Sequence, residues 1–222
     1  IQAINNVSID VKKGSITALI GPNGAGKTTL FNVINGSIKP DAGEMTLDNI
    51  NITGHEPHQL FNLGILRTFQ IAHEFSSLTV KDNLMMVPPN QIGESILQTW
   101  ISPQKIKIEE NEISKKADEV MDFLQLKHLS NEYAGNLSGG QKKLLELGRT
   151  MMVDAKLVLL DEVGAGVNRT LLKDLGTAIE KLNKEKGYTF CMIEHDMDFI
   201  GRLCDPVIVM AEGSVLFEGS VE

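Results

Sequence analysis

The stretch GPNGAGKTTL, residues 21–30, decides how this chain folds. Its first eight residues match G-x-x-x-x-G-K-[ST], a loop whose backbone N–H groups surround phosphates. In that pattern Lys27 reaches the β- and γ-phosphates, and Thr28 offers its hydroxyl to Mg²⁺. The apolar run SITALI (15–20) precedes the loop and a helical pattern begins at Lys27, so the context predicts a strand, a phosphate-binding loop and a helix. The residues expected to bind nucleotide here are Gly21, Pro22, Asn23, Gly24, Ala25, Gly26, Lys27, Thr28 and Thr29.

Short apolar runs alternate with helical patterns along the rest of the chain, which predicts an α/β fold. The expected strands are 15–20, 43–48, 65–70, 156–162, 188–194 and a closing hairpin within 206–219. The expected helices begin at residue 27 and span 78–86, 108–124, 170–186 and 196–204, with Thr79 as the N-cap of the second. We expect an irregular segment over 88–103. This pattern predicts a nucleotide-binding core of residues 1–70 and 154–222 and a helical subdomain of residues 71–153.

The composition bounds the function. A chain of 222 residues with 42% hydrophobic residues can bury a sizeable core. Its net charge of −8 argues against nucleic acid as a partner, because such partners are usually met by a basic face. No apolar run approaches the length that spans a bilayer, and the first residues lack the pattern of a signal peptide. Cys191 and Cys204 match no metal or redox spacing, so we expect buried thiols in a reducing cytosol.

Two carboxylates follow the apolar strand LVLL at 157–160. Asp161 is expected to hold Mg²⁺, as the strand-end aspartate of phosphate-loop enzymes does. Glu162 leaves the backbone in a different direction and could activate a water molecule for attack on the γ-phosphate. A solvated acidic turn is the competing interpretation, which we rank below the catalytic one because a phosphate loop is present.

His195 and Gln70 each follow an expected strand. An imidazole at the end of a sheet where ligands bind could contact the γ-phosphate or the attacking water. A side-chain amide at Gln70 could touch both a metal ion and a water. Each residue alone is a weak signal, since a lone His or a loop Gln is more often a plain surface residue.

LSGGQ at 137–141 supplies a second anion-binding helix start. Together with the other motifs, in their order along the chain, it resembles the ATP-binding cassette ATPases over essentially the whole sequence. The resemblance implies a P-loop NTPase core with a mixed sheet plus a helical subdomain, ATP and Mg²⁺ as cofactors, and Mg²⁺-dependent ATP hydrolysis. It also implies a head-to-tail pair of ATPase subunits, in which one chain's LSGGQ closes over the other's nucleotide. The residues carried over for that contact are Ser138, Gly139, Gly140 and Gln141.

Finer features look like the ATPases of branched-chain amino acid importers: RTFQ, FSSLTVKDNLMM, the helical insert, AGVN and MIEHDMDFI. This implies permease subunits that span the membrane, an indirect link to a solute-binding protein, and a peripheral place on the cytoplasmic face of the inner membrane. A groove near residues 70–87 is the expected docking surface. Importers of urea or of another small polar solute, and the lipopolysaccharide-export ATPase, are related possibilities.

The sequence departs from the family pattern in three places. Val163 stands where the family has proline, and Asn168 stands where it has aspartate. No aromatic residue precedes Phe31, although the family stacks adenine on one. We therefore expect the chain to begin inside the domain, after a first strand.

Three further functions compete with a transporter ATPase. A cassette ATPase of DNA repair or of the ribosome would carry long coiled coils or a second cassette with a basic linker. A GTPase would read guanine with a box that NKEK (183–186) matches only in part. The third is a nucleotide-binding regulator without turnover; the presence of Lys27, Glu162 and His195 together speaks against it, and an ATPase assay would decide.

Overall fold

The computed structural model describes residues 3–68, 74–95 and 100–220. Contacts divide the chain into two units, the first made of residues 1–70 and 155–222 and the second of residues 71–154. The strands of the first unit are β1 (Ile16–Ile20), β2 (Thr46–Leu47), β3 (Ile50–Asn51), β4 (Ile65–Arg67), β5 (Leu157–Asp161), β6 (Phe190–Ile193), β7 (Val207–Ala211) and β8 (Ser214–Gly219). Its helices are α1 (Lys27–Ile34), α2 (Pro57–Asn62), α7 (Arg169–Lys186) and α8 (Met197–Leu203).

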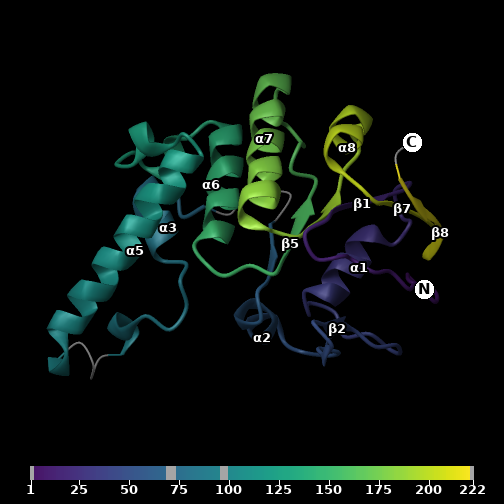
Figure 1. Ribbon diagram of the computed structural model, residues 1–222, viewed down its shortest axis with the longest axis horizontal. Coiled ribbons are helices and arrows are strands. Elements are labelled where there is room, and N and C mark those ends of the chain that lie inside the picture. Colours follow the sequence, from purple (N-terminus) through teal and green to yellow (C-terminus); the bar gives the residue numbers. More distant parts are fainter. Residues whose placement is uncertain (1–2, 69–73, 96–99, 221–222) are drawn as a thin grey trace. The chain divides into compact units, whose positions relative to one another are not determined.

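The main sheet of the first unit has the strand order β4-β5-β6-β1-β7-β8 (Figure 1). Neighbouring strands from β4 to β7 run parallel, and β8 pairs antiparallel with β7. The expected α/β fold with a mixed sheet is confirmed. Because the carboxyl ends of parallel strands share one edge, the segments after β1, β5 and β6 meet there.

Helices cover both faces of this sheet. Figure 1 shows α1 on one side and α7 with α8 on the other. Side chains alternate along each strand, so Leu19 and Leu159 pack in the cluster that holds Phe31 of α1. Their neighbours Ala18 and Leu160 are also buried. The strands are therefore buried on both faces and read as continuous apolar runs.

The second unit is helical. Its elements are α3 (Val80–Met85), α5 (Pro103–Phe123), α6 (Gly139–Met151) and the 3₁₀ turns η1 (Ile92–Glu94), η2 (Lys127–Leu129) and η3 (Ala134–Asn136). The three α-helices contact one another around buried side chains such as Leu84, Met121 and Leu145. Gly148 lets them approach closely, because a Cβ there would lie 2.8 Å from Leu124 Cδ1 and 3.2 Å from Leu84 Cδ2.

The elements agree with the predictions at most positions. Thr79 caps α3 by accepting a hydrogen bond from the Asp82 N–H at 3.1 Å, as expected. The long helix begins at Pro103 and not at residue 108, since proline suits the first turn of a helix. The expected strand at 43–48 is reduced to two residues, and α2 and β3 were not predicted. None of the helices in the described ranges combines the length and the apolar character needed to cross a bilayer.

Candidate functional site

The phosphate loop joins β1 to α1 at the shared edge of the sheet. Gly21 has φ 146°, and a Cβ on it would lie 2.0 Å from the Met210 carbonyl oxygen. Gly26 caps α1 in the left-handed conformation with φ 97°. Glycine is required at both positions because of close approach and a positive φ. The loop therefore ends at the N-terminus of α1, where the N–H groups of the first turn have no partner within the helix.

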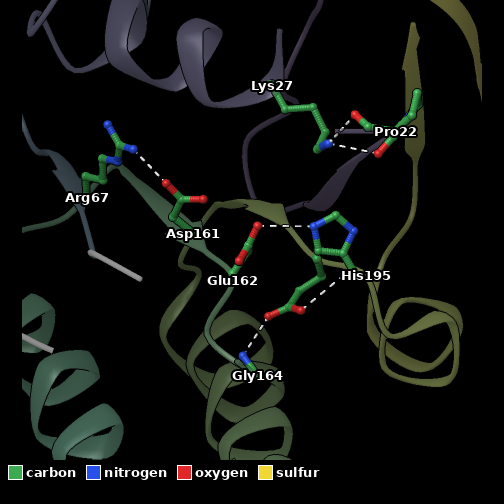
Figure 2. A network of polar contacts seen from close by, with 9 residues as sticks. Pro22, Lys27, Arg67, Asp161, Glu162, Gly164 and His195 are labelled. Atoms are coloured by element: carbon green, nitrogen blue, oxygen red, sulfur yellow. Dashed lines mark hydrogen bonds and ion pairs between the residues drawn. The ribbon is translucent and has the colours of Figure 1, made fainter. Parts of the chain in front are cut away.

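Lys27 folds back over this loop. Its side chain is buried, and its ammonium group donates hydrogen bonds to the carbonyl oxygens of Gly21 at 2.8 Å and Pro22 at 3.0 Å (Figure 2). The cation thus sits at the mouth of the loop, beside the N-terminus of α1. A positive charge and a helix N-terminus at one point favour a phosphate.

Asp161 lies at the end of β5 and is 7% exposed. Its carboxylate accepts a hydrogen bond from Arg67 Nη2 at 2.6 Å (Figure 2). The guanidinium nitrogen Nη1 donates to Asn32. The guanidinium carbon lies 5.9 Å from the centre of the Phe31 ring. A buried carboxylate needs such a partner, since an unpaired charge in the interior is costly. Arg67 therefore holds Asp161 at the sheet edge.

Glu162 and His195 face each other across the ends of β5 and β6. His195 Nε2 and Glu162 Oε1 are 3.1 Å apart, and Figure 2 shows both side chains converging at the sheet edge. The two side chains are 26% exposed for Glu162 and 50% for His195, so solvent reaches both. A carboxylate and an imidazole that share a hydrogen bond and contact water can take or hold a proton at this point.

Glu194 immediately precedes His195 in the chain and is 4% exposed. Its Oε1 accepts a hydrogen bond from the Gly164 N–H at 2.8 Å, and its Oε2 accepts one from the His195 N–H at 3.3 Å. Burial raises the pKa of this carboxyl, and the hydrogen bonds from Gly164 and His195 oppose the shift.

Thr28 and Asp161 supply the donor types that Mg²⁺ prefers, a hydroxyl and a carboxylate oxygen. Thr28 is exposed in the first turn of α1 and Asp161 ends β5. No cluster of three or more His, Cys, Asp or Glu that could hold a metal occurs within the described ranges. A Mg²⁺ ion here would therefore take most of its ligands from nucleotide phosphates and water, which is its usual preference.

The LSGGQ stretch begins α6 in the second unit. Ser138 is the N-cap, and its Oγ accepts a hydrogen bond from the Gln141 N–H at 3.4 Å while Gln141 Oε1 accepts from the Ser138 N–H at 2.9 Å. This capping box fixes the helix start. Gly139 is exposed and Gly140 is buried. The stretch thus presents a helix N-terminus with a hydroxyl beside it.

The structure places most of the site residues expected from the sequence, but not all of them. Asp161, Glu162 and His195 lie at the edge that also holds the phosphate loop, whereas Gln70 lies outside the described residues. Sequence reasoning missed Arg67 and Glu194. The sequence signal that could have found them is a charged residue at the carboxyl end of an apolar strand. In the structure the side chains of both residues are largely buried.

Comparison with known proteins identifies the family. A family model described as "ABC transporter" matches residues 4–165. The chain belongs to the ABC transporter family. It is 44% identical over its whole length, and over 85% of the relative, to a protein of Archaeoglobus fulgidus named probable branched-chain amino acid transport ATP-binding protein LivG. A protein of the same name from Methanocaldococcus jannaschii is 42% identical over 100% of this chain and 85% of its own length.

A solved structure described as the ADP conformation of an ATP-binding cassette of an ABC transporter shares the fold. Its TM-score is 0.82 at 41% identity, covering 98% of this chain and 85% of the other. The expected ABC ATPase cassette is confirmed, and the chain is an ATP-hydrolysing enzyme of this family. The GTPase interpretation fails, since Asn183 lies inside α7 and its side chain donates to the carbonyl oxygens of Gly14 and Tyr188, both at 2.8 Å.

Proposed function

We propose that this chain is the ATP-hydrolysing subunit of an importer of branched-chain amino acids. The supporting observation is its 44% identity, over the whole of this chain and 85% of the relative, to an ATP-binding protein named for branched-chain amino acid transport. The chain would act as one of two ATPase subunits and bind permease subunits in the membrane. Its place would be the cytoplasmic face of the plasma membrane, and a solute-binding protein would deliver the amino acid.

The residues take the following roles in this proposal. The loop 21–29 binds the ATP phosphates, and Lys27 turns from its carbonyl partners to the β- and γ-phosphates. Thr28, Asp161 and Gln70 would hold Mg²⁺, which supplies charge neutralisation of the phosphates when bound. Arg67 orients the Asp161 carboxylate by donating a hydrogen bond to it at 2.6 Å.

Glu162 is the proposed general base. Its carboxylate accepts a proton from the water that attacks the γ-phosphate, and the 3.1 Å contact with His195 orients it. The other ring nitrogen of His195, Nδ1, can accept a hydrogen bond from the water, or donate to the γ-phosphate when the ring is protonated. Ser138, Gly139, Gly140 and Gln141 would face the nucleotide of the second subunit, where a helix N-terminus stabilises negative charge.

A docking surface for the permease is proposed near residues 70–87. Phe75 is 47% exposed there, and the Arg149 guanidinium lies 5.7 Å from its ring centre. Asn83 fixes the backbone around it by accepting from the Phe75 N–H at 2.9 Å and donating to the Phe75 carbonyl at 3.1 Å. An exposed ring on a fixed loop suits contact with another protein.

The substitution Glu162→Gln tests the catalytic assignment. We expect ATP binding to persist and turnover to fall by about 10²–10⁴-fold, because the side chain can no longer accept a proton. Glu212→Gln is a matched control: Glu212 is also a non-glycine residue with φ 48°, but it is exposed in the turn between β7 and β8. Turnover close to the wild-type rate in the Glu162 variant would remove the base assignment.

The solute is tested by uptake. Cells that lack this chain should take up radiolabelled leucine, isoleucine and valine more slowly, while uptake of lysine stays unchanged. The wild-type chain should restore uptake and the Glu162→Gln variant should not. Normal uptake of all three branched amino acids without the chain would overturn the proposed solute class.

A further inference from the structure

The loop between β5 and α7 carries Glu162 and needs to be held in place. Glu162 leaves the strand with φ 48°, in the left-handed region. The turn continues through hydrogen bonds from the Ala165 N–H to the Glu162 carbonyl at 3.0 Å and from the Val167 N–H to the Gly164 carbonyl at 3.2 Å. These two bonds are local to the loop. Its backbone contact with the neighbouring strand β6 is made at its first residue, where the Glu162 N–H donates to the Ile193 carbonyl at 2.9 Å. The segment after β6, which carries His195, must nevertheless keep a 3.1 Å contact with Glu162.

Glu194 supplies a connection between the two segments. The Gly164 N–H, two residues after Glu162, donates to Glu194 Oε1 at 2.8 Å. The His195 N–H donates to the other oxygen of the same carboxylate at 3.3 Å. One side chain thus binds both backbone segments that carry the facing pair. Gly164 is closely packed as well, since a Cβ on it would lie 3.5 Å from both carboxylate oxygens and 3.0 Å from Leu172 Cδ1.

A carboxylate is a costly way to make this connection. Glu194 is 4% exposed, and a buried charge is stable only where hydrogen bonds compensate for lost water. Two N–H donors provide that compensation, and hydrogen bonds to a charged acceptor are stronger than those between neutral groups. A carboxylate also has two oxygens at fixed separation, so it can accept from two backbone segments at once.

We propose that Glu194 is a positioning residue, which accepts the Gly164 and His195 N–H groups and so sets the distance between Glu162 and His195. The inference rests on the proposed role of Glu162 as the base. It assigns Glu194 no contact with nucleotide or water. Its effect is on the rate of the chemical step, because a misplacement of about 1 Å at a reacting group can cost about 10²-fold in rate.

Three substitutions separate hydrogen bonding from packing. Glu194→Gln keeps the length and one acceptor oxygen for the Gly164 N–H. Glu194→Met keeps a similar volume and removes both acceptors. Glu194→Asp keeps the charge but withdraws the oxygens by one methylene, and it remains informative if the methionine variant does not fold. Thermal unfolding of each variant establishes that the compared proteins are folded.

Steady-state hydrolysis and amide exchange test the proposal together. In Glu194→Met and Glu194→Asp we expect kcat to fall about 10- to 100-fold with the KM for ATP within about twofold of wild type. Glu194→Gln should recover most of the rate. Without nucleotide, hydrogen exchange over residues 163–168 should speed up in the methionine and aspartate variants and stay close to wild type in the glutamine variant.

The outcomes distinguish this inference from the proposed function. Wild-type rates in folded Glu194→Met and Glu194→Asp would overturn it, as would a rise in KM with kcat unchanged, or equal losses in the glutamine and methionine variants. If Glu162→Gln retained wild-type turnover, the base assignment would fail. The exchange measurement on nucleotide-free protein would still decide whether Glu194 holds the loop.

Discussion

At the scale of single residues, Glu162 combines an uncommon backbone conformation with a facing partner. Its φ of 48° lies in a region that residues other than glycine seldom occupy. Such a conformation costs about 1–3 kcal/mol and persists where the surroundings determine it. Here the Glu162 N–H is held by the Ile193 carbonyl at 2.9 Å, and Val163 beside it is buried. Val163 occupies the position where the family pattern has proline, and packing in the interior holds the turn in its place.

Arg67 should be important for stability as well as for the site. Replacing it with methionine leaves the Asp161 carboxylate buried without this guanidinium, and removing one partner of a buried ion pair costs about 3–5 kcal/mol. The control Asn32→Ala removes one hydrogen bond from the same guanidinium and should cost less, about 1.5–3 kcal/mol. Urea unfolding of nucleotide-free protein measures both. Equal losses of unfolding free energy in the two variants would mean that the ion pair with Asp161 contributes no more than the single hydrogen bond to Asn32.

Cys191 should make the pH dependence of stability steeper in alkali. Burial raises the pKa of its thiol to about 12, and the nearby Cys204 adds to the shift. The unfolded thiol ionises near its ordinary pKa of about 8.5. The folded state therefore keeps a proton that the unfolded state loses, so this contribution is present below about pH 8.5 and is lost as the pH rises toward 12.

Two measurements check this expectation. Between pH 8 and pH 10 the unfolding free energy of wild type should fall by about 1–2 kcal/mol more than that of Cys191→Ala, since the titrations of all remaining groups cancel in the comparison. At pH 8 a thiol reagent should leave the native protein unlabelled and label both cysteines after denaturation, because both are buried. Rapid labelling of native protein would contradict the assigned burial.

The residue patterns predicted which groups lie at the carboxyl edge of the sheet but not what holds them there. Lys27, Asp161, Glu162 and His195 could be placed because each follows a strand in a parallel sheet. Arg67 and Glu194 were missed since their partners are set by the strand order, and Arg67 and Asp161 are 94 positions apart in sequence. Contacts across such a separation are not encoded in local periodicity.

At the scale of elements, length decided what the sequence could predict. The buried strands and α7 have strong patterns and were found within a few residues. The helix α2 was missed because its N-cap, Glu56, is an uncommon capping residue, whereas the equally short α3 was found from its Thr79 cap. The pair β2–β3 is a two-residue ladder. Elements this short have no periodicity to read.

Asn168, one of the departures from the family pattern, has a local role as the N-cap of α7. Its side chain accepts a hydrogen bond from the Leu171 N–H at 2.9 Å. Asn168→Ala should cost about 1 kcal/mol of unfolding free energy. Asn168→Asp keeps the acceptor and adds a negative charge at a helix start whose first turn has no acidic residue, so it should be neutral or stabilising by about 0.3–1 kcal/mol. Urea unfolding of the two variants checks the order, and a loss in the aspartate variant equal to that in the alanine variant would exclude a capping role.

At the scale of the whole molecule, the two helix starts proposed to bind anions belong to different units of the chain. The phosphate loop opens α1 in the first unit, and Ser138 caps α6 in the second. Each unit has its own buried core. Sequence motifs predicted both helix starts, but a motif carries no information on whether its ligand is bound by the same chain or by another. That question needs an experiment with two chains.

Complementation between two inactive variants supplies that experiment. Lys27→Ala removes a phosphate contact, and Ser138→Arg blocks the LSGGQ helix start by size and charge. Each pure variant has a defect at every site in a head-to-tail dimer. A mixed dimer collects both defects in one site, and the other site joins an intact phosphate loop from the Ser138→Arg chain to an intact LSGGQ from the Lys27→Ala chain. Mixing should therefore restore ATP-dependent association, measured by light scattering, and part of the hydrolysis if one intact site suffices.

If Ser138 served the nucleotide of its own chain, every site in the mixture would keep one defect. Failure of the two folded variants to associate with ATP after mixing would contradict the shared site.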